Sequence, residues 1–246
     1  MTAAEAKQLT KKYKEKTAVD HLDLSVNEGE FFALLGVNGA GKTTTVRMLS
    51  CLSKPTSGEC FIMGHSCKTE SAQVKRLAAV SPQDTAVAEK LTVRENLEMI
   101  CGIYGFDKAK TRSKADEMIT LFGMKEYADS ASKTLSGGWK RRLSIAMALI
   151  TEPKVLFLDE PTLGLDVLAR RELWDILRGL KGKITIILTT HYMEEAEQLS
   201  DRIAIMINGN LAALGTLAEL ESMTGEKGLE NAFVSIAERG RKEAAE

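Results

Sequence analysis

One short stretch of the chain combines small, cationic and hydroxyl side chains in the order needed to hold a triphosphate. Its residues are Gly36, Val37, Asn38, Gly39, Ala40, Gly41, Lys42 and Thr43, and Thr44 follows them. Glycines let backbone N–H groups converge on a phosphate where no Cβ intrudes. Lys42 supplies a positive charge for the outer phosphates, and Thr43 supplies a hydroxyl for Mg²⁺. The stretch lies between an apolar run, residues 31–35, and a helix-forming one, residues 44–49, whose positive dipole end would face the same anion. This phosphate loop predicts that the chain binds a nucleoside triphosphate.

Two acidic residues, Asp159 and Glu160, directly follow an apolar run at residues 155–158. Carboxylates rarely end a buried strand without a reason. Beside a phosphate loop, the first acid can hold Mg²⁺ while the second polarises an attacking water. Asp159 is therefore the candidate metal ligand and Glu160 the candidate general base. A helix-capping pair before Pro161 is the alternative interpretation.

A second run of small residues, Leu135-Ser136-Gly137-Gly138, opens a helical pattern at residues 139–150. A helix N-terminus of this kind is a second place for phosphate oxygens. One nucleotide does not easily need two such sites from distant parts of one chain. We therefore expect two chains to face each other, each presenting this segment to the nucleotide that the other holds. An ordinary helix cap is the alternative interpretation.

The elements that must position these residues follow an α/β pattern. Short apolar runs alternate with longer helical ones, which favours a mostly parallel sheet covered by helices. Polar–apolar alternation in residues 6–26 indicates an antiparallel β portion ahead of that sheet. Residues 84–150 have helical periodicity and almost no strand signal, so we expect a helical subdomain inserted in the core. We expect residues 1–216 to form the catalytic domain and 217–246 a polar tail, possibly helical, that Leu229 and Phe233 could dock.

Composition limits the partners of such a domain. The chain is 44% hydrophobic and 27% charged, with 33 Lys+Arg against 34 Asp+Glu and a formal net charge of -1. This balance favours neither nucleic acid nor an anionic bilayer. No apolar run approaches the roughly 20 residues that cross a bilayer, so another chain would have to supply any membrane span. The four cysteines lack metal-ligand spacing, and we expect free thiols in the cytoplasm.

Taken together in order and spacing, these motifs resemble those of the ATP-hydrolysing subunit of an ABC transporter. The resemblance covers about residues 4 to 216. Besides the motifs above it includes Val80-Ser81-Pro82-Gln83, Leu163-Gly164-Leu165-Asp166, which matches the D-loop of the family, and Thr189-Thr190-His191, which matches its switch histidine. The resemblance implies a P-loop NTPase core, ATP and Mg²⁺ as cofactors, and ATP hydrolysis coupled to transport.

The resemblance also implies a role for each matched residue. Tyr13 would stack on the adenine ring, Gln83 would contact Mg²⁺ and the attacking water, and His191 would bind the γ-phosphate. The catalytic residues would be Glu160, His191 and Gln83, and the metal ligands Thr43, Gln83 and Asp159. Ser136, Gly137 and Gly138 would contact the γ-phosphate held by the opposite subunit, and Asp166 would lie at the dimer interface. Hydrolysis would then depend on closure of the dimer.

The sequence departs from the family after the signature glycines. Many members have Gln there, whereas this chain has Trp139 followed by Lys140-Arg141-Arg142. We expect Trp139 to alter packing at the dimer interface or the hydrolysis rate. We interpret the basic trio as a solvated face of the helix, in preference to a nucleic-acid contact.

Residues 91–97, 190–197 and 200–216 resemble bacterial efflux ATPases that work with a type-2 permease. The implied partners are a second ATPase subunit, identical or related, and a membrane permease in a separate chain; no nucleic acid is expected. The protein would lie at the cytoplasmic face of the membrane and be soluble when isolated. We expect the permease to contact the groove near residues 83–91, where Glu89 and Lys90 should matter for assembly.

Two other functions are compatible with the same motifs. The first is a soluble ABC ATPase that acts on ribosomes or DNA, but such proteins usually carry a second ATPase core or a coiled-coil or zinc insertion, and this chain shows neither. The second is a nucleotide-gated regulatory subunit with little hydrolysis. Glu160 argues against it, because inactive sites often lack that base.

Overall fold

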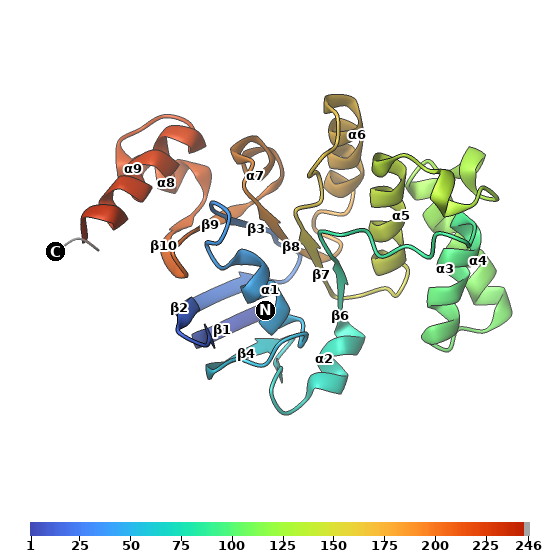
Figure 1. Ribbon diagram of the computed structural model, residues 1–246, viewed down its shortest axis with the longest axis horizontal. Coiled ribbons are helices and arrows are strands. Elements are labelled where there is room, and N and C mark those ends of the chain that lie inside the picture. The colour runs from blue at the N-terminus through green and yellow to red at the C-terminus, as the bar shows by residue number, and fades with distance from the viewer. Residues whose placement is uncertain (244–246) are drawn as a thin grey trace.

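The computed structural model describes residues 1–243, which form two β-sheets surrounded by helices (Figure 1). The strands are β1 (Thr2–Tyr13), β2 (Lys16–Asn27), β3 (Phe31–Leu35), β4 (Ser57–Ile62), β5 (His65–Ser66), β6 (Ala78–Ser81), β7 (Val155–Asp159), β8 (Thr185–Thr190), β9 (Arg202–Ile207) and β10 (Asn210–Gly215). The helices are α1 (Lys42–Leu49), α2 (Ser71–Leu77), α3 (Val93–Ile103), α4 (Lys108–Leu121), α5 (Gly137–Leu149), α6 (Val167–Arg178), α7 (Met193–Leu199), α8 (Leu217–Thr224) and α9 (Leu229–Glu243), with 3-10 turns at Lys125–Tyr127 and Ser132–Thr134.

The larger sheet has the strand order β10-β9-β3-β8-β7-β6. All its neighbouring strands pair in parallel except β10, which returns antiparallel to β9. The strands β3, β7 and β8 are buried along their whole length, as expected of parallel strands covered on both faces. Their carboxyl ends lie at one edge, which brings the phosphate loop, Asp159 and Thr190 together. The predicted α/β fold with a mostly parallel sheet is confirmed.

The smaller sheet is antiparallel, in the order β2-β1-β4-β5. It confirms the expected antiparallel portion and extends it by β4 and β5, which follow the phosphate loop in sequence. Helix α1 contacts strands of both sheets, and Val46, Met48 and Leu49 of α1 share one buried cluster with residues of both. The helix that follows the phosphate loop is therefore fixed between two layers of β structure.

Helices α3, α4 and α5 form the inserted helical part, at one end of the molecule in Figure 1. A capping box at Thr92 and Glu95 starts α3: the Glu95 N–H donates to the Thr92 hydroxyl and the Thr92 N–H to the Glu95 carboxylate. The helix α5 also contacts β6 and β7. It therefore joins the inserted helices to the sheet that carries the site.

The segment after residue 216 forms helices α8 and α9, at the other end of the molecule in Figure 1. Leu229 and Phe233 are buried, and they share a cluster with Ala33 and Leu35 of β3. Helix α9 contacts β9, β10 and α7, so the predicted docking residues lie in a buried cluster that also includes the strand leading into the phosphate loop. The sequence suggested a polar tail, possibly helical; the tail is helical, and Leu229, Phe233 and Ile236 form the buried apolar face of α9.

Candidate nucleotide site

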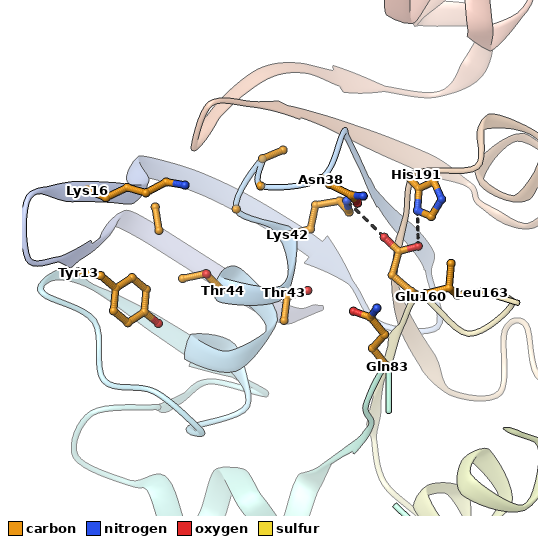
Figure 2. A pocket seen from close by; sticks show the side chains of 14 residues that line it. Tyr13, Lys16, Asn38, Lys42, Thr43, Thr44, Gln83, Glu160, Leu163 and His191 are labelled. Carbon is orange, nitrogen blue, oxygen red and sulfur yellow. Dashed lines mark hydrogen bonds and ion pairs between the residues drawn. The ribbon is translucent and has the colours of Figure 1, made fainter. Parts of the chain in front are cut away.

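A cavity of about 470 Å³ opens where the phosphate loop meets the ends of β7 and β8 (Figure 2). Its lining residues are Tyr13, Lys16, Ala18, Asn38, Gly39, Ala40, Gly41, Lys42, Thr43, Thr44, Gln83, Glu160, Leu163 and His191. Figure 2 shows Tyr13 and Lys16 at one end of the cavity, and Gln83, Glu160 and His191 at the other, with the phosphate loop between them. The structure thus brings together predicted residues from five separate parts of the sequence.

The glycines of the phosphate loop are also required by its packing. A Cβ on Gly36 would lie 2.4 Å from the Met206 carbonyl oxygen, and one on Gly41 would lie 2.5 Å from that of Ala18. Gly41 also has a φ of 104°, which disfavours residues with a side chain. Gly36 does not line the cavity; its carbonyl oxygen accepts a hydrogen bond from Lys42 Nζ at 2.7 Å. Close contact with the rest of the chain therefore fixes the shape of the loop.

Asp159 lies behind the cavity wall, buried at the end of β7. Its Oδ1 accepts hydrogen bonds from the hydroxyls of Thr43, at 2.9 Å, and Thr189. Carboxylate and hydroxyl oxygens are hard ligands of the kind that Mg²⁺ takes, and Mg²⁺ is usually held by few protein groups together with substrate phosphates. Among residues 1–243 no group of three or more His, Cys, Asp or Glu side chains could hold a metal by itself. The residues present therefore fit a magnesium ion that arrives with a nucleotide.

Glu160 is held between Lys42 and His191 at the far end of the cavity. Its Oε1 lies 3.3 Å from Lys42 Nζ, and its Oε2 lies 2.7 Å from His191 Nδ1. The backbone N–H of Glu160 donates to the carbonyl and hydroxyl oxygens of Thr189, both at 3.1 Å. The residue has a φ of 48°, an unusual conformation for a residue with a side chain. Bonds from both sides therefore fix the candidate base next to the phosphate loop.

The sequence did not identify several residues that complete this site. Lys16 and Ala18 line the end of the cavity near Tyr13, and Leu163 lines the end near Glu160. Lys16 pairs with Tyr13 across the turn between β1 and β2, so a hairpin signal after Tyr13 could have identified Lys16. Thr189 precedes the predicted histidine by two residues, and only the sheet register places it beside Asp159.

The second group of predicted residues does not reach this cavity. Ser136, Gly137, Gly138 and Asp166 line a separate cavity of about 410 Å³, together with Trp139, Arg142, Gly164, Leu165, Leu168, Ala169 and Glu172. Ser136 occupies the N-cap position of α5, yet its side chain makes no capping hydrogen bond. Asp166 caps α6 by accepting from the N–H groups of Leu168 and Ala169, both at 2.9 Å. In one chain, the two predicted phosphate sites therefore face different cavities.

The interpretation of the basic trio as a solvated face is wrong for two of its three residues, because only Lys140 is partly exposed. Arg141 and Arg142 are buried. Arg142 pairs with Glu172 of α6 and stacks at 4.5 Å on the ring of Trp139, whose own centroid lies 4.7 Å from that of Tyr127. Helix α5 presents both guanidinium groups to the protein interior, because neighbouring helices and the segment after β6 provide carbonyl and carboxylate acceptors there.

One further buried carboxyl lies near the site. Glu195 of α7 is fully buried, and the Trp174 indole N–H donates to its Oε1 at 3.2 Å. Burial raises the pKa of Glu195, and the negative charge of Glu160 adds to this effect. The predicted site motifs do not include Glu195, because its burial depends on how α6 and α7 pack.

The fold and this cavity define a nucleotide-binding protein of the phosphate-loop class. The family model described as "ABC transporter" matches residues 19–163. The chain belongs to the ABC transporter family, as an ATP-binding subunit with ATPase activity. Among residues 1–243 no helix has the length and apolar character needed to cross a membrane.

Relatives with known names support this assignment. The daunorubicin/doxorubicin resistance ATP-binding protein DrrA of Streptomyces peucetius is 45% identical over 224 residues, which cover 91% of this chain and 68% of DrrA. The probable multidrug ABC transporter ATP-binding protein YbhF of Escherichia coli is 39% identical over 248 residues, 98% of this chain and 43% of YbhF. Both of these relatives are longer than the part of them that matches.

Solved structures show the same fold. An ATP-binding subunit of an ABC transporter superposes with a TM-score of 0.86 at 30% identity, covering 95% of this chain and 99% of that one. A dimeric ATP-binding cassette in a post-hydrolysis state, bound to ADP and Pi, has a TM-score of 0.80 at 27% identity, covering 87% of this chain and 98% of that one.

Proposed function

We propose that this chain is the ATP-hydrolysing subunit of an exporter, and that two subunits enclose two ATP molecules head to tail. The observation that carries the proposal is the separation of the two phosphate sites within one chain. The phosphate loop faces one cavity, and the signature residues Ser136 to Gly138 face another. A second copy placed head to tail would complete each site. Leu168, 73% exposed beside the second cavity, is an apolar group that such a partner would cover.

The residues around the first cavity fit hydrolysis of the γ-phosphate. Lys42 would bind the outer phosphates, while Thr43, Gln83 and Asp159 would hold Mg²⁺, which supplies charge neutralisation between the phosphate oxygens when bound. Phosphate oxygens would compete with Glu160 for Lys42 Nζ. Released from Lys42, the Glu160 carboxylate could accept a proton from the attacking water, and His191 would remain beside it. Tyr13 would stack on adenine at the open end of the cavity.

The permease would bind at a second surface, the groove between the sheet and the inserted helices. This groove has a volume of about 540 Å³, and its lining includes Pro82, Ala86, Ile100 and Tyr104. Leu52 lines it too and is 63% exposed. An apolar cytoplasmic segment of a membrane permease fits these side chains, and this contact would place the subunit at the cytoplasmic face of the membrane. Residues 84–150 would then be the subdomain that the permease moves against the rest of domain 1–216.

The lining of this groove changes which residues should test the contact with the permease. Glu89 and Lys90 do not line it, and Glu89 pairs with Lys140 of α5 at 2.9 Å. Ala86→Glu would place a carboxylate in the groove and should reduce co-purification with the permease, while Lys90→Glu is the matched control outside it. Loss of ATP binding in Ala86→Glu, or equal loss of assembly in both variants, would contradict the proposed surface.

The proposed chemistry is tested by comparing the wild type with Glu160→Gln. We expect the wild type to hydrolyse ATP in the presence of Mg²⁺, and Glu160→Gln to bind ATP but turn it over at least about a hundredfold more slowly, the usual contribution of a general base. Glu160→Gln should also elute as an ATP-dependent dimer in gel filtration. Slow turnover in both proteins would indicate a regulatory subunit, and co-purification with ribosomes or DNA in place of a permease would indicate the soluble alternative.

A further inference from the structure

The side chain of Arg141 connects helix α5 to the backbone at Gln83. Its Nη1 donates to the Pro82 carbonyl oxygen at 2.6 Å, and its Nη2 donates to the Gln83 carbonyl oxygen. Arg141 is only 4% exposed, so water competes little for these bonds. The planar guanidinium can donate to two acceptors at once, and lysine cannot reproduce that geometry. Arg141 therefore fixes both position and orientation of the peptide that carries Gln83.

A second contact lies one turn further along the same face of α5. The hydroxyls of Ser144 and Ser81 are 3.1 Å apart, and both side chains are buried. Residues three apart on a helix are neighbours, so Arg141 and Ser144 together hold consecutive residues at the end of β6. By contrast, Lys140 reaches Glu89 on the surface, where an ion pair contributes little.

Nearby carboxylates partly offset the cost of burying the charge of Arg141. Burial lowers the pKa of its guanidinium, and the negative charges of Asp159, Asp84 and Glu195 act in the opposite direction. One of these, Asp159, is a proposed Mg²⁺ ligand. Arg141 thus belongs to the helix whose N-terminus lines the second cavity, and its side chain bonds the segment that carries Gln83 of the first.

We propose that Arg141 is a positioning residue that transmits movement of the signature helix to Gln83, and so links the two halves of the nucleotide site. The inference rests on the proposed function. Ser136 and Gly138, at the start of α5, would contact the nucleotide of the partner subunit, and Arg141 follows one turn later. A shift of α5 on dimer closure then moves the Gln83 backbone directly. Pro82 and Ser144 also line the permease groove. A movement of the permease in that groove would therefore reach Gln83 through the same contacts.

The test uses Arg141→Met, which keeps a long side chain and removes the donors, with Lys140→Met as the matched control on the same helix. Affinity for ATP without Mg²⁺ depends on the phosphate loop and Tyr13, and should stay within about twofold of the wild type in both variants. In Arg141→Met we expect kcat to fall on the order of tenfold, as for the loss of hydrogen bonds from a charged group. The Mg²⁺ concentration for half-maximal turnover should rise, because Gln83 would no longer be held in place. Lys140→Met should keep both values.

A purely structural role would lower the melting temperature and Mg²⁺-free ATP binding together, without changing turnover per folded molecule; that result would overturn the proposal. Wild-type kcat and Mg²⁺ dependence in folded Arg141→Met would overturn it as well. If Arg141→Met does not fold, Arg141→Lys serves in its place, because it retains the charge without the two-acceptor geometry. In Arg141→Lys we expect kcat to fall about threefold and the Mg²⁺ requirement to rise. If the wild type does not hydrolyse ATP, the proposed function fails. The effect of Mg²⁺ on ATP affinity then still tests the role of Arg141. An equal effect of Mg²⁺ in the wild type and in Arg141→Met would overturn the proposed link between Arg141 and Gln83.

Discussion

Thr189→Val tests how the metal-side carboxylate is held in place. The Thr189 hydroxyl, fully buried on β8, donates to Asp159 Oδ1 and accepts from the Glu160 N–H. Valine has nearly the same shape, so the substitution removes the hydroxyl and leaves little cavity. The Glu160 N–H keeps its bond to the Thr189 carbonyl oxygen at 3.1 Å. The main loss is therefore one hydrogen bond to a buried carboxylate.

The size of the effect follows from the charge of the acceptor. Hydrogen bonds to charged groups contribute about 1.5 to 3 kcal/mol. For a chain of this length, each kcal/mol lowers Tm by about 2 to 4 °C, so we expect Thr189→Val to melt about 3 to 12 °C below the wild type. The only other hydroxyl donor to Asp159 among the described residues is Thr43, the proposed Mg²⁺ ligand. Asp159 should therefore be less well oriented, and half-maximal turnover should need more Mg²⁺.

Thermal unfolding and Mg²⁺ titration of ATPase activity measure these two effects. Thr185→Val is the matched control, since Thr185 lies on the same strand, is equally buried, and accepts only from the Gly29 N–H at 3.0 Å. This bond between neutral groups should contribute about 1 kcal/mol to the free energy of unfolding. The Mg²⁺ dependence of turnover should be unchanged in Thr185→Val. Equal Tm losses in the two variants, or a wild-type Mg²⁺ response in Thr189→Val, would refute the reasoning.

Three other predictions follow from the geometry. Because burial raises the pKa of Glu195 above the ordinary 4.5, the unfolded chain loses this proton first and stability falls as pH rises above that value. Glu195→Gln stays neutral and should show a smaller loss of Tm over that range; parallel Tm curves would contradict this. Gly36→Ala should lower the free energy of unfolding by about 1 to 3 kcal/mol, because its Cβ would meet the Met206 carbonyl oxygen. Gly137→Ala should leave that free energy unchanged, because no atom lies within 4 Å of its Cβ. Denaturant unfolding measures both variants. Tyr13→Ala should weaken ATP binding about five- to tenfold and Tyr13→Phe little, as expected of stacking; equal losses by calorimetry would indicate a role for the hydroxyl.

The local chemistry of the first cavity could be predicted from the sequence. The phosphate loop and the Asp159-Glu160 pair each lie beside a short apolar run that must be a buried strand, so their placement depends on neighbouring residues alone. The parallel sheet then brings strand ends together, which is a property of the fold class. Such short-range patterns are reliable because few folds satisfy them.

The buried arginines of α5 and the position of Thr189 could not be predicted, because they depend on contacts between residues distant in the sequence. Arg141 and Arg142 form a cationic run with Lys140 in the sequence, and the structure buries them because acceptors come from residues 82–83, 122 and 172. Thr189 reaches Asp159 only through the register of β7 and β8. Charged residues are usually exposed, so sequence reasoning places buried, hydrogen-bonded arginines on the surface.

The packing of α9 against β9 and β10 has a practical consequence for protein engineering. The family model ends at residue 163 and the expected catalytic domain at 216, yet Leu229, Phe233 and Ile236 belong to one buried cluster with Ile203 and Ile205 of β9 and with Ala33 and Leu35 just before the phosphate loop. A chain shortened after residue 216 would expose this apolar surface to solvent and invite aggregation. Fusions, chimaeras and biosensors built on this subunit should therefore keep both terminal helices, and new modules should be joined after α9.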